Sequence, residues 1–182
     1  MDVAPSVRHL PGDRRAATDA MIRVDQAGEY GAARIYAGQL AVMGARARVA
    51  GEIRHMAAQE QRHLSAFDAL MTRRGVRPTL LGPLWHVAGY ALGAVSALAG
   101  PRVAMAVTVA VETEIDRHYG EQAEALADGS DPELAAMVDD FRADEVDHRD
   151  TAAGHAGAGA FPVMSAAIRA GCRAAIAAAT RI

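Results

Sequence analysis

The chain has little cysteine, few aromatic residues and no strong excess of either charge. Cys172 is the single cysteine, so an intramolecular disulfide and thiolate-based zinc or iron–sulfur sites are excluded, and a reducing compartment is expected. The net charge is −3 and no basic stripe interleaves with aromatic residues, so nucleic acid is not an expected partner. Aromatic residues make up only 4% of the chain, β-branched runs are short and alanine is abundant, which favours an all-α protein.

The N-terminal stretch also lacks the apolar run of a secretory signal. Residues 1–15, MDVAPSVRHLPGDRR, are expected to be a flexible N-terminus, with a single domain over 16–182. An apolar fraction of 51% is ample for one packed core. Periodicity and the placement of glycine and proline predict helices over these ranges: 16–45, 49–74, 101–127, 131–153 and 162–181.

The order of these helices predicts a ferritin-like four-helix bundle. The first two helices form one pair, the next two form another, and a long connection over about 75–100 joins the pairs. A bundle with one long crossover is the ferritin-like plan, in contrast to a simple up-and-down bundle. The range 162–181 is then an added C-terminal helix.

The crossover carries no charged side chain over residues 79–101, TLLGPLWHVAGYALGAVSALAGP. This apolar segment is long enough to span a bilayer, but Pro83 and several glycines interrupt it. A single crossing would put Glu60 and Glu112 on opposite sides of the membrane, and they could not then share a site. We therefore expect a helix that lies in the membrane interface, with a buried core helix or a dimer face as the alternative.

Two E-x-x-H motifs, Glu60–His63 and Glu145–His148, carry the chemistry of the chain. Residues three apart lie on one face of a helix, so each pair can bind one metal site together. Both glutamates project from apolar stripes, where an unpaired charge is strongly unfavourable. Each therefore needs a partner, and a metal ion is the natural one.

The first helix of each pair adds one glutamate on an apolar face, Glu29 and Glu112. One glutamate from each of two helices, with E-x-x-H from the other two, is the ligand set of di-iron and di-manganese proteins. We expect Glu60 and Glu145 to bridge the metals, because they face each other across the bundle. One ion would be completed by Glu29 with His63, the other by Glu112 with His148. Four carboxylates balance two ferrous ions, and oxygen-rich ligation with imidazole suits iron or manganese.

Residues near the ligands suggest supporting roles. Gly28 and Gly31 flank Glu29 within a helix, where they either clear space for dioxygen or substrate or allow close helix packing. Asp25, Asp144 and Asp147 lie close to the ligands in sequence. Each either accepts a hydrogen bond from a ligand histidine or is a solvated surface charge.

Five internal segments and the C-terminal ending are specific enough to suggest a family. The segments are DQAGEYGA (25–32), AAQEQRH (57–63), PLWHVAGYALGA (83–94), AMAVTVAVETEIDRHYGEQ (104–122) and FRADEVDH (141–148), and the ending is AAIRAGCRAAIAAATRI. They resemble the demethoxyubiquinone hydroxylases of ubiquinone biosynthesis, over about residues 20–182. The resemblance implies that the six glutamates and histidines bind metal, and that His118 and Tyr119 have a substrate-side or electron-relay role.

The same resemblance implies an activity and its surroundings. The expected enzyme is a monooxygenase that uses dioxygen to hydroxylate the ring of a demethoxyubiquinol-type polyprenyl benzoquinol, a late step of ubiquinone biosynthesis. It would bind two iron ions per subunit and use NADH as an external reductant. It would lie peripherally on the cytoplasmic face of a bacterial inner membrane, or on the matrix side of the mitochondrial inner membrane. Expected partners are a lipid-presenting protein and other ubiquinone-biosynthesis enzymes.

Three other functions remain open for the residues themselves. A ferritin-like ferroxidase or iron-storage protein would share the ligands, although an uncharged crossover fits a soluble shell poorly. A di-iron hydroxylase of tRNA bases would need a basic patch, which the chain lacks. A non-catalytic quinone-binding protein would bind the lipid without oxygen-dependent turnover.

Overall fold

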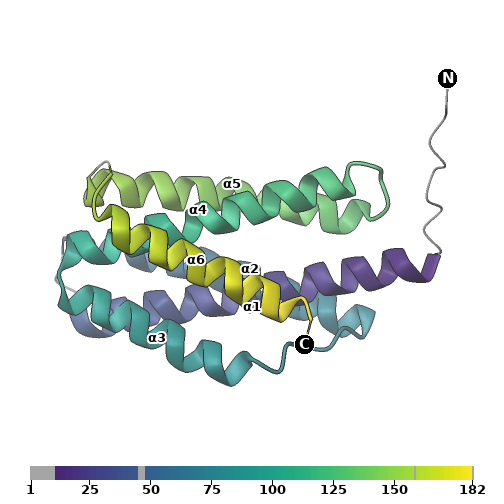
Figure 1. Ribbon diagram of the computed structural model, residues 1–182, viewed down its shortest axis with the longest axis horizontal. Helices are drawn as coiled ribbons and strands as arrows, with labels where there is room; N and C mark the ends of the chain where they lie inside the picture. Colours follow the sequence, from purple (N-terminus) through teal and green to yellow (C-terminus); the bar gives the residue numbers. More distant parts are fainter. Residues whose placement is uncertain (1–10, 45–47, 158, 182) are drawn as a thin grey trace.

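The computed structural model describes residues 11–44, 48–157 and 159–181, and these residues form α-helices and no strand (Figure 1). Helices α1, α2, α4 and α5 make a four-helix bundle, α3 is the crossover and α6 is an added C-terminal helix. The predicted all-α, ferritin-like plan is confirmed. The bounds are α1 (Pro11–Met43), α2 (Ala50–Arg74), α3 (Gly82–Leu98), α4 (Pro101–Leu126), α5 (Pro132–Ala156) and α6 (Pro162–Ala179).

The helices pack as two pairs, each with one covering helix. Helix α1 packs on α2 and is covered by α3, while α4 packs on α5 and is covered by α6. Contacts of α1 with α4 and of α2 with α5 close the bundle between the pairs. Two apolar clusters fill its interior, one containing Ile22, Phe67 and Phe141 and the other containing Ile53 and Met105. Along each bundle helix, the predicted metal ligands fall between these clusters.

Helix α1 is longer at its N-terminus than the sequence predicts. It begins at Pro11, so residues 11–15, predicted to belong to a flexible N-terminus, are helical in the structure. Proline is favoured in the first turn of a helix, where its missing N–H needs no partner, and Pro11 is the first residue of α1. Residues 1–10 and 45–47 of the predicted segments lie outside the described residues. The division into a tail and one domain over 16–182 stays a prediction.

Helix α3 lies against α1 along a seam of glycines. A Cβ atom at Gly93 would lie 1.9 Å from a carbonyl oxygen of α1, and one at Gly38 would lie 2.2 Å from a carbonyl oxygen of α3. Only glycine permits so close an approach of two backbones. A Cβ at Gly28 or Gly31 would meet nothing within 4 Å, so the packing of the helices does not require glycine at these two residues.

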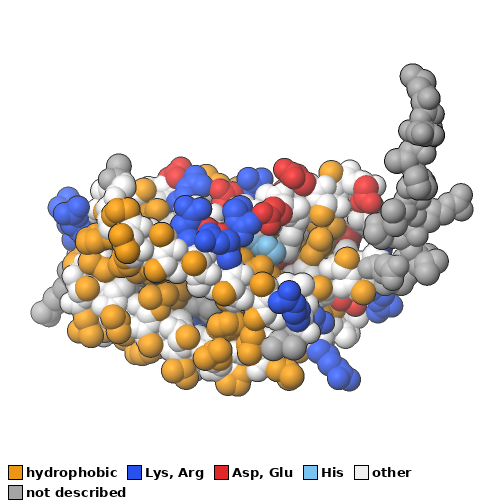
Figure 2. All heavy atoms as spheres, viewed as in Figure 1, with side chains coloured by type: hydrophobic (Ala, Val, Ile, Leu, Met, Phe, Trp, Pro, Cys, Tyr) orange, Lys and Arg blue, Asp and Glu red, His pale blue; other side chains and the backbone are white. Residues whose placement is uncertain are grey.

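The outer side of α3 is apolar and exposed. Only Gly93, Ser96 and Ala97 of this helix are buried, whereas Val87 is 66% exposed and Leu98 is 75% exposed. The alternative of a buried core helix is therefore wrong for this chain on its own. Hydrophobic side chains gather over α3 and α6 on the face seen in Figure 2. No helix in the described part of the chain is long and apolar enough to cross a membrane.

Candidate metal centre

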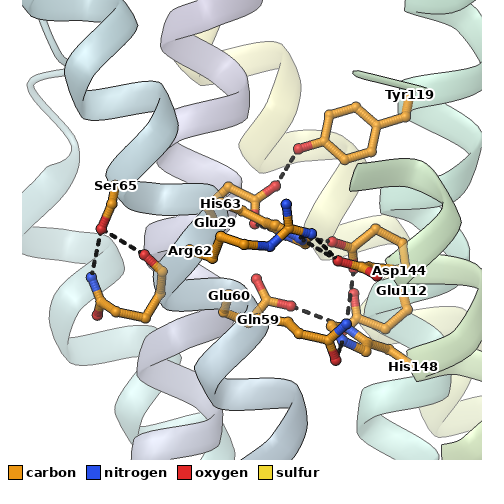
Figure 3. A network of polar contacts seen from close by, with 12 residues as sticks. Glu29, Gln59, Glu60, Arg62, His63, Ser65, Glu112, Tyr119, Asp144 and His148 are labelled. Atoms are coloured by element: carbon orange, nitrogen blue, oxygen red, sulfur yellow. Dashed lines mark hydrogen bonds and ion pairs between the residues drawn. The ribbon is translucent and has the colours of Figure 1, made fainter. Parts of the chain in front are cut away.

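The six predicted ligands meet in the middle of the bundle (Figure 3). Each is at most 1% exposed, although four of them are carboxylates. Every helix of the bundle contributes, because the glutamate or E-x-x-H motif falls on its inward face. The residues are Glu29 on α1, Glu60 and His63 on α2, Glu112 on α4, and Glu145 and His148 on α5.

The six side chains form two overlapping groups of donor atoms. In the first, atoms of Glu29, His63 and the two central glutamates lie within 4.8 Å of one another. In the second, atoms of Glu112, His148 and the same two glutamates do so. The shared residues are Glu60 and Glu145. This arrangement suits two cations held side by side, with Glu60 and Glu145 in contact with both.

Unpartnered polar atoms at the centre fit such cations. Both carboxylate oxygens of Glu60 and of Glu145 are buried without a hydrogen-bond partner, as are Oε2 of Glu112 and Nδ1 of His148. Nδ1 of His148 lies 3.2 Å from Oε1 of Glu60, yet the two do not form a hydrogen bond. A buried polar group without a partner costs about 1–3 kcal/mol. These donors converge without satisfying one another, which is what a shared metal ion would require.

The pKa values of the cluster show the same crowding of charge. Burial, and then the negative charge of Glu145, raise the pKa of Glu60 and of Glu112 well above the usual range. Burial disfavours the protonated imidazole of His63, but the nearby carboxylates of Glu145 and Glu29 outweigh this effect and raise its pKa to about 10. Without metal, protons must therefore neutralise part of the cluster. Metal binding would displace these protons.

The two histidines point the same ring nitrogen inward. Nδ1 of His63 lies 3.2 Å from both Glu29 and Glu145, while its Nε2 lies 3.0 Å from Oδ2 of Asp144. Nε2 of His148 lies 3.1 Å from Oε1 of Gln59, a partner that the sequence did not suggest. Asp144 thus contacts a ligand histidine, which was one of its two expected roles, whereas Asp147 is exposed. Such outer contacts fix the orientation of a ligand imidazole.

Two buried tyrosines hold the remaining glutamates. The Tyr36 hydroxyl donates to Oε1 of Glu112 over 2.7 Å, and the Tyr119 hydroxyl donates to Oε1 of Glu29. Burial, followed by the neighbouring glutamate, raises the pKa of both tyrosines well above its usual value, so the hydroxyls keep their protons. Tyr119 was expected near the substrate and contacts a predicted ligand. The sequence did not suggest the role of Tyr36.

His118 lies outside the cluster and contacts none of the six ligands. Its Nε2 is 3.3 Å from Oδ1 of the buried Asp25, to which Gln122 also donates over 2.7 Å. Asp25 therefore pairs with His118, and the expectation that it orients a ligand histidine is wrong. His118 and Gln122 line a surface recess of about 310 Å³ between α1 and α4. The predicted relay role of His118 stays a prediction.

The fold and the donor set define a class, the helical-bundle proteins that bind two metal ions through carboxylates and histidines. Residues 16–179 match the family described as "Ubiquinone biosynthesis protein COQ7". A 3-demethoxyubiquinol 3-hydroxylase of Rhodospirillum rubrum is 56% identical over 171 residues, which cover 92% of this chain and 80% of that protein. The chain belongs to this family of ubiquinone-biosynthesis hydroxylases, as the sequence resemblance predicted.

Eukaryotic relatives are also similar over most of their length. The NADPH-dependent 3-demethoxyubiquinone 3-hydroxylase, mitochondrial, of Mus musculus is 50% identical over 173 residues, covering 92% of this chain and 79% of that protein. The 5-demethoxyubiquinone hydroxylase, mitochondrial, of Saccharomyces cerevisiae is 40% identical over 196 residues, covering 98% of this chain and 84% of that protein.

Proposed function

We propose that this chain is a di-iron monooxygenase that hydroxylates the ring of a demethoxyubiquinol-type polyprenyl benzoquinol with dioxygen, a late step of ubiquinone biosynthesis. The observation that carries the proposal is the buried cluster of four glutamates and two histidines, whose central oxygens lack partners. Family membership supplies the reaction, because the relatives are named as hydroxylases of demethoxyubiquinol or demethoxyubiquinone.

The side chains of the cluster have distinct tasks in this proposal. Glu29 with His63 would hold one iron ion, Glu112 with His148 would hold the other, and the two central glutamates would serve both. When bound, the iron pair would supply the redox chemistry that activates dioxygen. The hydroxyls of the two buried tyrosines fix the outer glutamates, and the apolar clusters on either side keep water away from the reacting ring.

The reaction also needs two electrons from outside the chain. Hydroxylation of the quinol by dioxygen yields the hydroxylated quinol and one water molecule, and consumes one hydride equivalent with one proton. We assign the role of electron donor to NADH, which would deliver its electrons through the quinone substrate. The described residues contain no strand, and hence no parallel-sheet dinucleotide fold, which favours this indirect route.

The substrate tail places the enzyme at a membrane surface in this proposal. Exposed apolar side chains on α3 and at the start of α6, among them Leu84, Val87, Leu98 and Val163, would enter the interface without spanning it. In a bacterium this surface would be the cytoplasmic face of the inner membrane, and in a eukaryote the matrix side of the mitochondrial inner membrane. A lipid-presenting protein and other ubiquinone-biosynthesis enzymes would act beside it.

Product analysis by mass spectrometry tests the proposal directly. Iron-loaded protein, a short-chain demethoxyquinone and isotopically labelled dioxygen are incubated with NADH, and in parallel with NADPH, because several relatives are named as NADPH-dependent. We expect one labelled oxygen atom in the ring and no product from metal-free protein or from Glu60→Ala. Protein that holds two iron ions yet gives no product with either nucleotide would contradict the proposed activity.

A further inference from the structure

The two ligand histidines differ in the group that holds their outer nitrogen (Figure 3). Nε2 of His63 faces a carboxylate oxygen of Asp144 at 3.0 Å, whereas Nε2 of His148 faces the amide oxygen of Gln59 at 3.1 Å. Each partner comes from the opposite E-x-x-H motif, one residue before its glutamate. A carboxylate carries a full negative charge and an amide carries none, so the two imidazoles face different electrostatic fields at their outer nitrogens.

The other contacts of the cluster do not offset this difference. Tyr119 donates to Glu29 on one side and Tyr36 donates to Glu112 on the other, so the outer glutamates have equivalent partners. The two central glutamates belong to both groups of donors. The contacts of the histidines therefore distinguish the two positions.

The ring of His63 is also held more firmly than that of His148. Phe141 stacks on His63 with ring centroids 4.1 Å apart and an angle of 20° between the planes. The ring nearest to His148 from the apolar interior is that of Tyr36, edge-on with centroids 6.4 Å apart. A ligand fixed before the metal arrives loses less conformational freedom on binding, which favours tighter binding at His63.

Arg62 opposes part of the charge of Asp144 but also fixes its position. The guanidinium bonds to Asp144, and to Asp140 over 2.9 Å, and it lies 5.1 Å above the ring of Phe141. Its Nη2 also lies 3.4 Å from Nε2 of His63, beside the carboxylate of Asp144. The Arg62 side chain is 49% exposed, so water screens its charge, whereas the imidazole of His63 is completely buried. The field of Asp144 at His63 is therefore reduced and not cancelled.

We propose that the two metal positions are unequal, and that the Glu29–His63 position binds its ion first and more tightly than the Glu112–His148 position. Asp144 and Gln59 act as positioning residues that set this order through the histidines they contact. The inference rests on the proposed function only in requiring that the six residues bind two metal ions. Outer partners of this kind change metal affinity by about 10–100-fold.

Variants of the full chain that lack the outer glutamate of one position, here called half-site variants, measure the metal affinity of the other position alone. They also avoid cooperativity between the two ions. Glu112→Ala leaves the Glu29–His63 position intact, and Glu29→Ala leaves the Glu112–His148 position intact. Mn²⁺ is the probe, because it suits oxygen-rich sites and the electron paramagnetic resonance signal of the free ion reports binding without any turnover. We expect Glu112→Ala to bind one Mn²⁺ about tenfold or more tightly than Glu29→Ala does.

Reciprocal substitutions of Asp144 and Gln59 then test whether these residues cause the difference in metal affinity. In the Glu112→Ala protein, Asp144→Asn should weaken Mn²⁺ binding by about 10–100-fold. In the Glu29→Ala protein, Gln59→Glu should tighten Mn²⁺ binding, a gain that misfolding cannot mimic. Asp140→Asn is the matched control for the first change because Asp140 binds the same Arg62 without contacting His63. Gln61→Glu, on the exposed side of α2, controls for the second.

Each outcome separates this inference from the proposed function. Equal affinities of the two half-site proteins, or equal losses from Asp144→Asn and Asp140→Asn, would overturn the inequality of the positions. Wild-type protein that still binds two Mn²⁺ ions in that case would leave the di-metal site intact. Wild-type protein that binds no Mn²⁺ and no Fe²⁺ would overturn both.

Discussion

Replacing Glu60 by glutamine should change the stability of the protein in opposite directions with and without metal. Glu60 is completely buried, and both of its carboxylate oxygens lack hydrogen-bond partners. Burial, and then the charge of Glu145, raise its pKa, so the ionised form is unfavourable in the metal-free protein. Glutamine has nearly the same shape and no charge, and its NH₂ group can donate to the neighbouring carboxylates. Without metal, Glu60→Gln should therefore stabilise the fold.

The magnitude follows from the unpartnered atoms and depends on pH. Removing the cost of a buried polar group without a partner corresponds to about 1–3 kcal/mol of unfolding free energy. A carboxyl whose pKa is raised on folding contributes stability at low pH, and this contribution is lost as the pH rises through its native pKa. The advantage of Glu60→Gln over wild type should therefore be small in acid and grow toward neutral pH.

With metal present the sign should reverse. Metal that binds only the folded state adds about 2.7 kcal/mol of stability at a concentration one hundred times the dissociation constant. Because Glu60 belongs to both donor groups, Glu60→Gln weakens both positions and loses most of this gain. Glu52→Gln, an exposed glutamate on the same helix, is the matched control and should leave the metal effect unchanged.

Urea unfolding followed by circular dichroism measures these free energies, in a chelator and in excess Mn²⁺, across a range of pH. The reasoning would be refuted if Glu60→Gln destabilised the metal-free protein by more than the Glu52→Gln control. A wild-type protein whose unfolding midpoint did not move with Mn²⁺ would refute it equally.

Three further predictions concern stability away from the metal. Gly93→Ala should destabilise the docking of α3, because its Cβ would meet a carbonyl oxygen at 1.9 Å. Gly171→Ala, in open space on α6, should instead stabilise the fold by about 0.5–1 kcal/mol in thermal unfolding. Phe67→Ala, at a fully buried position, should lower the unfolding free energy by about 3–5 kcal/mol in urea, and a loss below 1 kcal/mol would contradict the core assignment. Arg74 lowers the pKa of Asp131, so Asp131→Asn should reduce the unfolding free energy near pH 7. This loss should vanish as the pH falls below about 4, where Asp131 becomes protonated in the wild type as well. A loss that is independent of pH would contradict this ion-pair effect.

The sequence predicted the helices of the bundle and the meeting of the six polar residues, because both follow from helical periodicity. Glu29, Glu60 and Glu112 each fall in an apolar stripe, and a stripe turns inward when helices pack. The predicted starts of the last two helices, at 131 and 162, agree within one residue with α5 and α6, which begin at Pro132 and Pro162, since proline fits the first turn.

Features that depend on how two helices meet were harder to predict. Two glycines of one helix differ in what a side chain would meet, since a Cβ at Gly31 would meet open space and a Cβ at Gly38 would meet the backbone of α3. Which glycine is in contact depends on where α3 crosses α1, and periodicity along one helix does not contain that information. The pairing of Asp25 with His118 likewise depends on the register between α1 and α4.

The outer partners of the metal cluster nevertheless follow a regular spacing once the two halves are compared. Tyr36 lies seven residues after Glu29, and Tyr119 lies seven residues after Glu112, and each tyrosine bonds to the glutamate of the other helix. Repeated spacing therefore locates a supporting shell as well as the ligands. Against that symmetry, Gln59 and Asp144 occupy matching positions with different charge. Because the contacts between tyrosines and glutamates repeat, this difference in charge is a place where the two halves can act differently on their metals.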